Sequence, residues 1–154
     1  MHFPIIEIVS DKNELGKFGI YEDVTLEYFT DYYGDEYSEE ERIETIEQLK
    51  EFFDGLATVN VENGTVTVNS SGTIRHDLIE YHKKLLEKLR NEADKDESIS
   101  RRFLELRKAG HFYKDDDAMF FYDGGGYTSM QFVEDLVFSA GKILYIGKIY
   151  DAHY

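Results

Sequence analysis

Alternation of apolar and polar residues marks the segments of this chain that we expect to form strands. Between Phe18 and Tyr28 the apolar side chains share one face, and this period of two indicates a half-buried strand. Shorter apolar runs at Phe3–Val9, Ala118–Tyr122 and Ile143–Tyr150 also have strand length. A turn around Asp11–Gly16 separates the first two segments, so we expect them to form an antiparallel hairpin.

The first segment with helical spacing begins at Ser38. Ser38 and Glu41 have the spacing of a capping box, in which each residue's side chain bonds the other's backbone N–H. The apolar line that follows consists of Ile43, Ile46, Leu49 or Lys50, and Phe53. Gly55 is placed to end this helix.

Three further segments have the spacing of amphipathic helices. The longest is Ile74–Ala93, and a polar break separates it from Ile99–Ala109. Thr128 and Gln131 make a second capping box for a helix that runs to Ala140. The apolar stripe of the longest helix is Ile74, Leu78, Tyr81, Leu85 and Leu89.

A β-hairpin is expected on either side of Asn63-Gly64. This dipeptide favours a type I′ turn with a two-residue loop. Such a loop pairs Val61 with Val66 and Val59 with Val68, which places all four valines on one face.

The order of these elements is ββ-α-ββ-α-α-β-α-β. This mixture predicts a single α+β domain over residues 1–154, with about four helices packed on a mostly antiparallel sheet. The length of 154 residues fits one domain with a sizeable core.

Composition narrows the class of protein. Apolar residues make up 42% of the chain, with 12 Tyr and 11 Phe, which is too much for a disordered protein. There are no cysteines, so disulfides, thiolate metal sites and cysteine nucleophiles are excluded. The N-terminal residues lack the pattern of a signal peptide, and no apolar run is long enough to span a membrane. We expect a cytoplasmic protein with no membrane partner and no cofactor.

The net charge of −15 is concentrated in the first half of the chain. Residues 1–70 hold 17 acidic and 4 basic residues, whereas residues 71–154 hold 15 and 13. Direct binding to nucleic acid or to an anionic membrane is disfavoured, because phosphates require clustered Lys and Arg. The asymmetry instead indicates one acidic face.

The acidic residues are densest between Thr30 and Glu47, where eight carboxylates accompany one arginine. The helix dipole explains the glutamates of the first helical turn but not Glu44, Glu47 or Glu51. Together with Glu40, these three form a stripe with carboxylates about 5–6 Å apart, which costs about 0.2–0.5 kcal/mol per pair. The long second helix, by contrast, intersperses its glutamates with Lys and Arg.

Self-repulsion that is tolerated locally suggests that the charge serves a partner. The three tyrosines upstream of the helix add contact area suited to a binding surface. The sequence therefore predicts a non-enzymatic inhibitor that occludes a basic nucleic-acid-binding protein or nuclease by mimicking nucleic acid. Phage anti-defence proteins such as anti-CRISPRs, and immunity proteins against nuclease toxins, have this role. The predicted binding residues are Asp31, Tyr32, Tyr33, Asp35, Glu36, Tyr37, Glu40, Glu44, Glu47 and Glu51.

Two alternatives stay open. Asp115–Asp117 and Asp123, with Glu134 and Asp135 downstream, could hold a divalent metal in a hydrolase or nuclease. The protein could also be an adaptor whose acidity is incidental.

Two further motifs are weaker signals of a site. His76 and Glu80 lie one helical turn apart, but no third metal ligand accompanies them. Gly124–Gly126 could cradle a phosphate, although a tight turn is the simpler interpretation because Asp123 would repel an anion.

Overall fold

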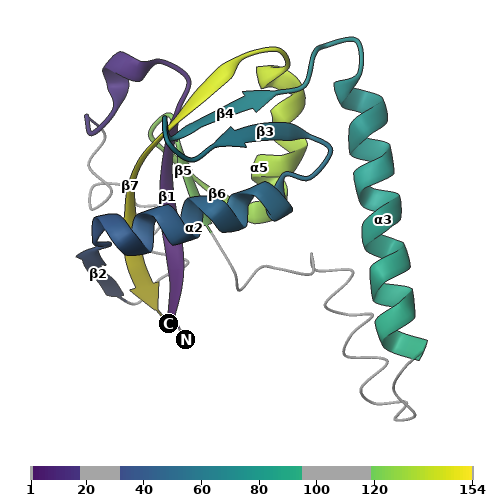
Figure 1. Cartoon of the computed structure of the whole chain (residues 1–154), viewed down its shortest axis with the longest axis horizontal. Coiled ribbons are helices and arrows are strands. Elements are labelled where there is room, and N and C mark those ends of the chain that lie inside the picture. The colour runs from purple at the N-terminus through teal and green to yellow at the C-terminus, as the bar shows by residue number, and fades with distance from the viewer. Residues whose placement is uncertain (1, 18–31, 95–118, 154) are drawn as a thin grey trace.

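The computed structural model describes residues 2–17, 32–94 and 119–153. These residues form an α+β fold around one seven-stranded mixed sheet, in which only the β1–β5 pair is parallel (Figure 1). The order is β3-β4-β7-β1-β5-β6, and β2 pairs with β7 beside this path. The strands are β1 (His2–Val9), β2 (Tyr32–Glu36), β3 (Ala57–Asn60), β4 (Thr65–Val68), β5 (Met119–Tyr122), β6 (Gly125–Thr128) and β7 (Ile143–His153). The predicted fold class is confirmed, but the order of elements differs.

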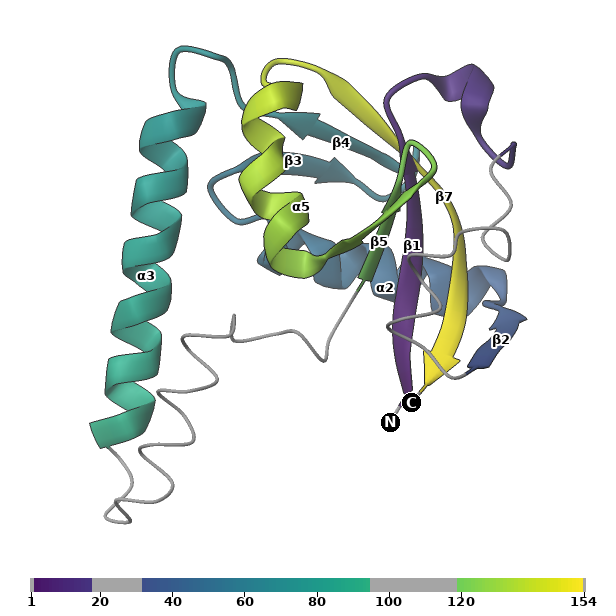
Figure 2. The same cartoon turned by 180° about the vertical axis from the view of Figure 1, so that it is seen from behind.

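Three α-helices lie in the described part of the chain, where about four were expected over all residues. They are α2 (Glu39–Phe52), α3 (Ile74–Asp94) and α5 (Ser129–Asp135), with short 3-10 helices η1 (Lys12–Glu14) and η3 (Leu136–Ser139). Figures 1 and 2 show α3 standing beside the rest of the fold, whereas α2 and α5 pack against the sheet. The predicted strand Phe18–Tyr28 and helix Ile99–Ala109 lie outside the described residues.

Several predicted elements are confirmed with small shifts of their ends. Strand β1, helix α3 and strand β5 begin within one residue of the predicted positions, and β7 extends three residues further than predicted. Thr128 and Gln131 make the predicted capping box of α5, but the α-helix ends at Asp135 and the 3-10 helix η3 follows it, where an α-helix to Ala140 was predicted. On α3, Ile74 and Tyr81 are buried and Leu78 and Leu85 are half-buried, as the stripe predicted.

The core joins α2, α5 and the sheet through three phenylalanines. Phe120 of β5 stacks on Phe132 of α5 with ring centroids 4.3 Å apart. Phe53, just after α2, lies 6.0 Å from each of these rings. All three side chains are buried, so the end of α2 is fixed against both the sheet and α5.

The predicted buried face of α2 is wrong at one residue. Ile46, Leu49 and Phe53 are buried, but Ile43 is 43% exposed. Thr45 is buried instead, and its hydroxyl donates to the Glu41 carbonyl oxygen at 2.9 Å. That hydrogen bond satisfies the hydroxyl group and lets a polar residue occupy the buried face.

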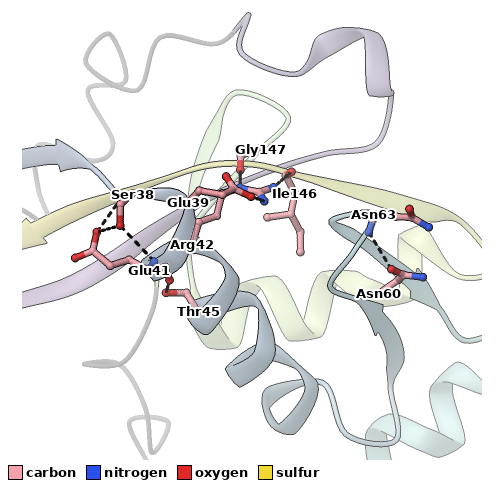
Figure 3. A network of polar contacts seen from close by, with 9 residues as sticks. All are labelled: Ser38, Glu39, Glu41, Arg42, Thr45, Asn60, Asn63, Ile146 and Gly147. Atoms are coloured by element: carbon pink, nitrogen blue, oxygen red, sulfur yellow. Dashed lines mark hydrogen bonds and ion pairs between the residues drawn. The ribbon is translucent and has the colours of Figure 1, made fainter.

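The register predicted for the β3–β4 hairpin is also wrong. Val59 pairs with Val66 and Ala57 with Val68, which leaves a four-residue loop over 61–64. A type I′ turn needs two positive φ angles, but Asp123 is the only described residue other than glycine with φ above zero. Asn63 N–H instead donates to Asn60 Oδ1 at 2.9 Å and holds the wider loop (Figure 3). A register shift of two residues leaves each side chain on the same face of the sheet, so the predicted buried face of the hairpin is still correct.

The turn that has the type I′ geometry is Asp123-Gly124. Its φ angles are 45° and 86°, and it joins β5 to β6 with Tyr122 paired to Gly125. The Gly124–Gly126 segment is therefore a hairpin turn and the start of a strand that the sequence did not predict. Strand β6 begins with two glycines, and glycine is rare in strands because it has no side chain to pack. The sequence therefore gave no strand signal at this position.

Part of the segment before α2 is a strand that the sequence did not predict. Tyr32–Glu36 is strand β2, in which Tyr32 pairs with His153 and Tyr33 with Ala152 of β7. Strand β7 thus pairs β1 along one side, and β4 and then β2 along the other. A pairing with the last strand of the chain has no local signature in the sequence.

A buried carboxyl group lies at a bulge between β1 and β7. Glu7 is 3% exposed, and the pairing register shifts between Ile6 and Ile8. Glu7 Oε1 accepts the Gly16 N–H at 2.8 Å and Oε2 accepts the Lys148 N–H at 3.0 Å. The side chain occupies the space beside Gly147, whose missing Cβ makes room for it.

The capping box of α2 gives a pH-dependent prediction. The Ser38 hydroxyl donates to Glu41 Oε2 at 2.6 Å, and this bond, followed by the one from the Ser38 backbone N–H, lowers the pKa of Glu41. Because the pKa of Glu41 is lower in the folded state, its ionised form stabilises the fold at pH values above the ordinary pKa of 4.5. That stabilisation is lost as the pH falls through the lower folded-state pKa. We expect Ser38→Ala to lower the free energy of unfolding by about 1 kcal/mol at neutral pH, measured by urea unfolding. The variant should also lose less stability than the wild type when the pH is lowered. An identical acid-induced loss in both proteins would contradict this role of Ser38.

Candidate binding surface

The only arginine of α2 makes its hydrogen bonds inside the fold and not with the glutamate stripe. Between the stretches of β7 that pair with β4 and β2, Arg42 Nε donates to the Gly147 carbonyl oxygen and Nη2 to that of Ile146, each at 3.0 Å (Figure 3). Its contact with Glu39 is longer, at 3.7 Å, and the Glu39 side chain is 77% exposed. Arg42 therefore closes a gap in the hydrogen bonding of the sheet.

The predicted stripe of glutamates points away from the core. At about 100° per residue, these four positions span about 60° of the helix and lie opposite the buried face formed by Thr45, Ile46 and Leu49. All four are exposed: Glu40, Glu44, Glu47 and Glu51. Glu47 binds Lys50 at 2.7 Å, and the other three have no ion pair among the described residues.

An acidic groove of about 670 Å³ runs along the side of this stripe. It lies between α2 and the β2–β7 edge, and Tyr37 is half-buried in it. Burial, and then the nearby Asp151 and Glu41 carboxylates, raise the pKa of Tyr37. The lining residues are Pro4, Glu36, Tyr37, Glu41, Glu44, Thr45, Gln48 and Asp151.

The structure brings part of the predicted binding set together. Glu36, Tyr37 and Glu44 line the groove, whereas Glu40, Glu47 and Glu51 lie on the helix beside it. Glu36 also binds Lys148 of β7 at 2.8 Å. Asp31 lies outside the described residues, and Tyr32, Tyr33 and Asp35 are placed only as backbone of β2.

Two acidic residues of the groove were missed from the sequence. Glu41 was assigned to helix capping alone, and the structure shows that it serves both as cap and as groove wall. Asp151 comes from the end of the chain and reaches the groove because β7 pairs with β2. No local pattern in the sequence places Asp151 next to α2.

The aspartates at the centre of the metal-site alternative, Asp115–Asp117 and Asp123, do not form a site in the described residues. Both Asp123 oxygens accept from Ser10, from its N–H at 2.8 Å and its hydroxyl at 2.7 Å. Asp115–Asp117 lie outside the described chain. Within residues 2–17, 32–94 and 119–153, no three His, Asp or Glu side chains are grouped to hold a metal ion.

The pair of His76 and Glu80 on α3 has a structural explanation. Glu80 Oε1 binds Lys83 at 2.7 Å, and this hydrogen bond is the main cause of the lowered pKa of Glu80, with a smaller effect from His76. The pair of exposed His76 and half-buried Glu80 is therefore part of a charged helix surface.

Fold and surface together define an α+β protein with a mixed sheet and an acidic helix on its outside. No protein family, curated protein or solved structure matches the chain. The helices of the described segments are too short or too polar to cross a membrane.

Proposed function

We propose that the outer face of α2 binds a basic, nucleic-acid-handling protein and occludes its substrate groove, as a non-enzymatic inhibitor. The observation that carries this proposal is the use of Arg42 inside the sheet. Because its guanidinium is bound to two β7 carbonyl oxygens, the glutamate stripe of α2 is paired only through Lys50, which binds Glu47. Glu40, Glu44 and Glu51 have no ion pair among the described residues.

The stripe and the groove would have different tasks in such a complex. Exposed carboxylates on one helix face accelerate the approach of a basic partner and set its orientation. The groove, with Tyr37 beside carboxylates, suits an arginine or lysine side chain, because a cation is attracted both to the carboxylates and to the aromatic ring. A partner that binds phosphates presents such side chains in a row.

Charge reversal tests the proposal. We expect Glu40→Lys/Glu44→Lys/Glu47→Lys to lose the partner that the wild-type protein captures from cell and phage lysates. Binding of the wild type should weaken with added salt, and duplex DNA or heparin should compete with it for the captured protein, because all of them address the same basic surface. The measurement is quantitative mass spectrometry of the captured proteins, followed by titration calorimetry with the purified partner.

A variant with the same net charge separates a specific surface from overall acidity. Glu62→Lys/Glu87→Lys/Glu134→Lys changes three exposed glutamates that do not belong to α2. This control should bind as the wild type does, and circular dichroism should show that both variants are folded. Equal binding by all three proteins would show that the stripe is not the interface. If the partner is captured, its identity and the neighbouring genes separate phage anti-defence from toxin immunity.

A further inference from the structure

A second hollow, with a different chemistry, lies between the end of α2 and the side of α3. It has a volume of about 380 Å³. Figures 1 and 2 both show α3 standing beside the C-terminal end of α2. The lining residues are Lys50, Glu51, Phe52, Asp54, Tyr81, Lys84, Leu85 and Lys88. This volume is at the lower end of the range of about 300–1,000 Å³ that is typical of small-molecule sites.

The apolar part of this hollow is fixed in place by the core. Tyr81 OH donates to the Phe52 carbonyl oxygen at 3.0 Å, which ties α3 to the end of α2. The Phe52 ring meets the Phe53 ring edge to face at 4.8 Å and lies 5.5 Å from the Phe120 ring. Leu85, one turn after Tyr81, is half-buried beside them. Two aromatic rings and a leucine therefore form a rigid apolar wall.

The charged part carries three lysines, which is unusual on a protein with a net charge of −15. Lys84 pairs with Asp54 at 3.4 Å and Lys50 with Glu47 at 2.7 Å, while Lys88 has no ion pair among the described residues. The two pairs are exposed, with side-chain exposures of 66% and 70%, and of 49% and 52%. Exposed pairs of this kind contribute only about 0–1 kcal/mol, so an anionic ligand can replace their carboxylates at little cost.

We propose that this hollow binds a small amphiphilic anion, in which an apolar chain or ring carries one carboxylate or sulfonate. The apolar body would lie against Phe52, Tyr81 and Leu85, and the anionic end would meet Lys84 and Lys88. Glu51 and Asp54 on the rim disfavour a ligand with several negative charges, such as a nucleotide, and favour a single charge. This proposal does not rest on the function proposed for α2, although Glu51 lines the hollow and Glu47 pairs with Lys50 at its edge.

Titration with 8-anilinonaphthalene-1-sulfonate tests the proposal, since this probe has an apolar body and one anionic group and fluoresces when it leaves water. We expect a saturable increase in fluorescence that sodium decanoate reverses by competition. The uncharged analogue N-phenyl-1-naphthylamine should bind more weakly. Amide chemical shifts in NMR spectra should change for residues 50–54 and 81–88.

Matched variants decide whether the lysines take part. Lys84→Gln/Lys88→Gln should weaken the binding of the anionic probe by roughly fivefold or more, because two favourable charges are removed. Lys12→Gln/Lys17→Gln removes two lysines at η1 and should leave the affinity unchanged. All the lysines involved are exposed, so the variants should fold, and a thermal melt checks this.

Three results would overturn the proposal. One is the absence of saturable binding at millimolar probe concentration, and another is a set of shift changes located elsewhere in the protein. The third is equal affinity of the wild type and Lys84→Gln/Lys88→Gln for the anionic probe. Loss of partner binding in Glu40→Lys/Glu44→Lys, which leaves Glu47 and Glu51 in place, with unchanged probe binding would confirm that the two sites act separately.

Discussion

Replacing Gly147 with alanine is expected to lower the free energy of unfolding by about 3 kcal/mol or more. A Cβ atom built on Gly147 would lie 2.6 Å from Glu7 Cδ and closer still to Oε2. Glu7 cannot simply move away, because its two oxygens hold the N–H groups of Gly16 and Lys148 and its side chain is 3% exposed. The substitution must therefore break those bonds or open the β1–β7 bulge. Urea unfolding followed by circular dichroism measures the loss.

Two controls make this prediction specific. Gly72→Ala should be close to neutral, because the nearest atom to its added Cβ is Ser70 Oγ at 3.8 Å. Glu7→Ala alone should cost about 2–3 kcal/mol, since two backbone N–H groups lose their acceptor. The double variant Glu7→Ala/Gly147→Ala should lose less stability than the sum of the single variants, because the collision is gone. Strict additivity would show that Glu7 and Gly147 do not constrain each other.

Arg42→Met is expected to lower the free energy of unfolding by about 3 kcal/mol. The guanidinium donates to the carbonyl oxygens of Ile146 and Gly147, at a position where β7 lies between its pairings with β4 and β2. Methionine keeps much of the side-chain volume but cannot donate a hydrogen bond. Hydrogen exchange should show faster opening of the amides near the bulge, in addition to the loss seen by urea unfolding.

Conservative and distant substitutions test the geometry of this contact. Arg42→Lys should recover little of the lost stability, because an ammonium group lacks the planar fork that reaches two carbonyl oxygens at once. Arg75→Met on the exposed surface of α3 should change stability by less than about 0.5 kcal/mol. If Arg42→Lys is as stable as the wild type, charge at this position matters more than the paired hydrogen bonds.

The elements that the sequence predicted well are those in which local signals agree. Apolar spacing and capping residues placed α2, α3 and α5, because a helix satisfies its backbone hydrogen bonds within one short segment. The outward stripe of glutamates on α2 follows from the same periodicity. The exposed Ile43 and the buried Thr45 show the limit of that reasoning, because the sheet decides which side of the helix it contacts.

Turn chemistry was the least reliable of the local signals. Asn63-Gly64 and Asp123-Gly124 are both favourable for a type I′ turn, yet only the second adopts one. Asn60 Oδ1 holds a wider loop in the first case, and the Ile146 N–H donates to the Gly64 carbonyl oxygen at 2.8 Å. The second bond comes from β7, far along the chain, so no local pattern could have selected the loop.

By itself, the sequence determined the α+β class, the main helices, several strands and the acidic side of α2, because periodicity and capping act over a few residues. Only the tertiary structure decided that Tyr32–Glu36 is a strand, that Asp151 joins the acidic groove and that a hollow with three lysines lies between α2 and α3. It also decided the role of Arg42, whose guanidinium binds β7 and not the glutamate stripe, because β7 presents carbonyl oxygens that β4 and β2 do not reach. Apart from the hollow, whose walls lie 29 residues apart at Phe52 and Tyr81, these features depend on contacts between segments about 100 residues apart in the chain. Pairing across such distances leaves no periodic trace in the sequence.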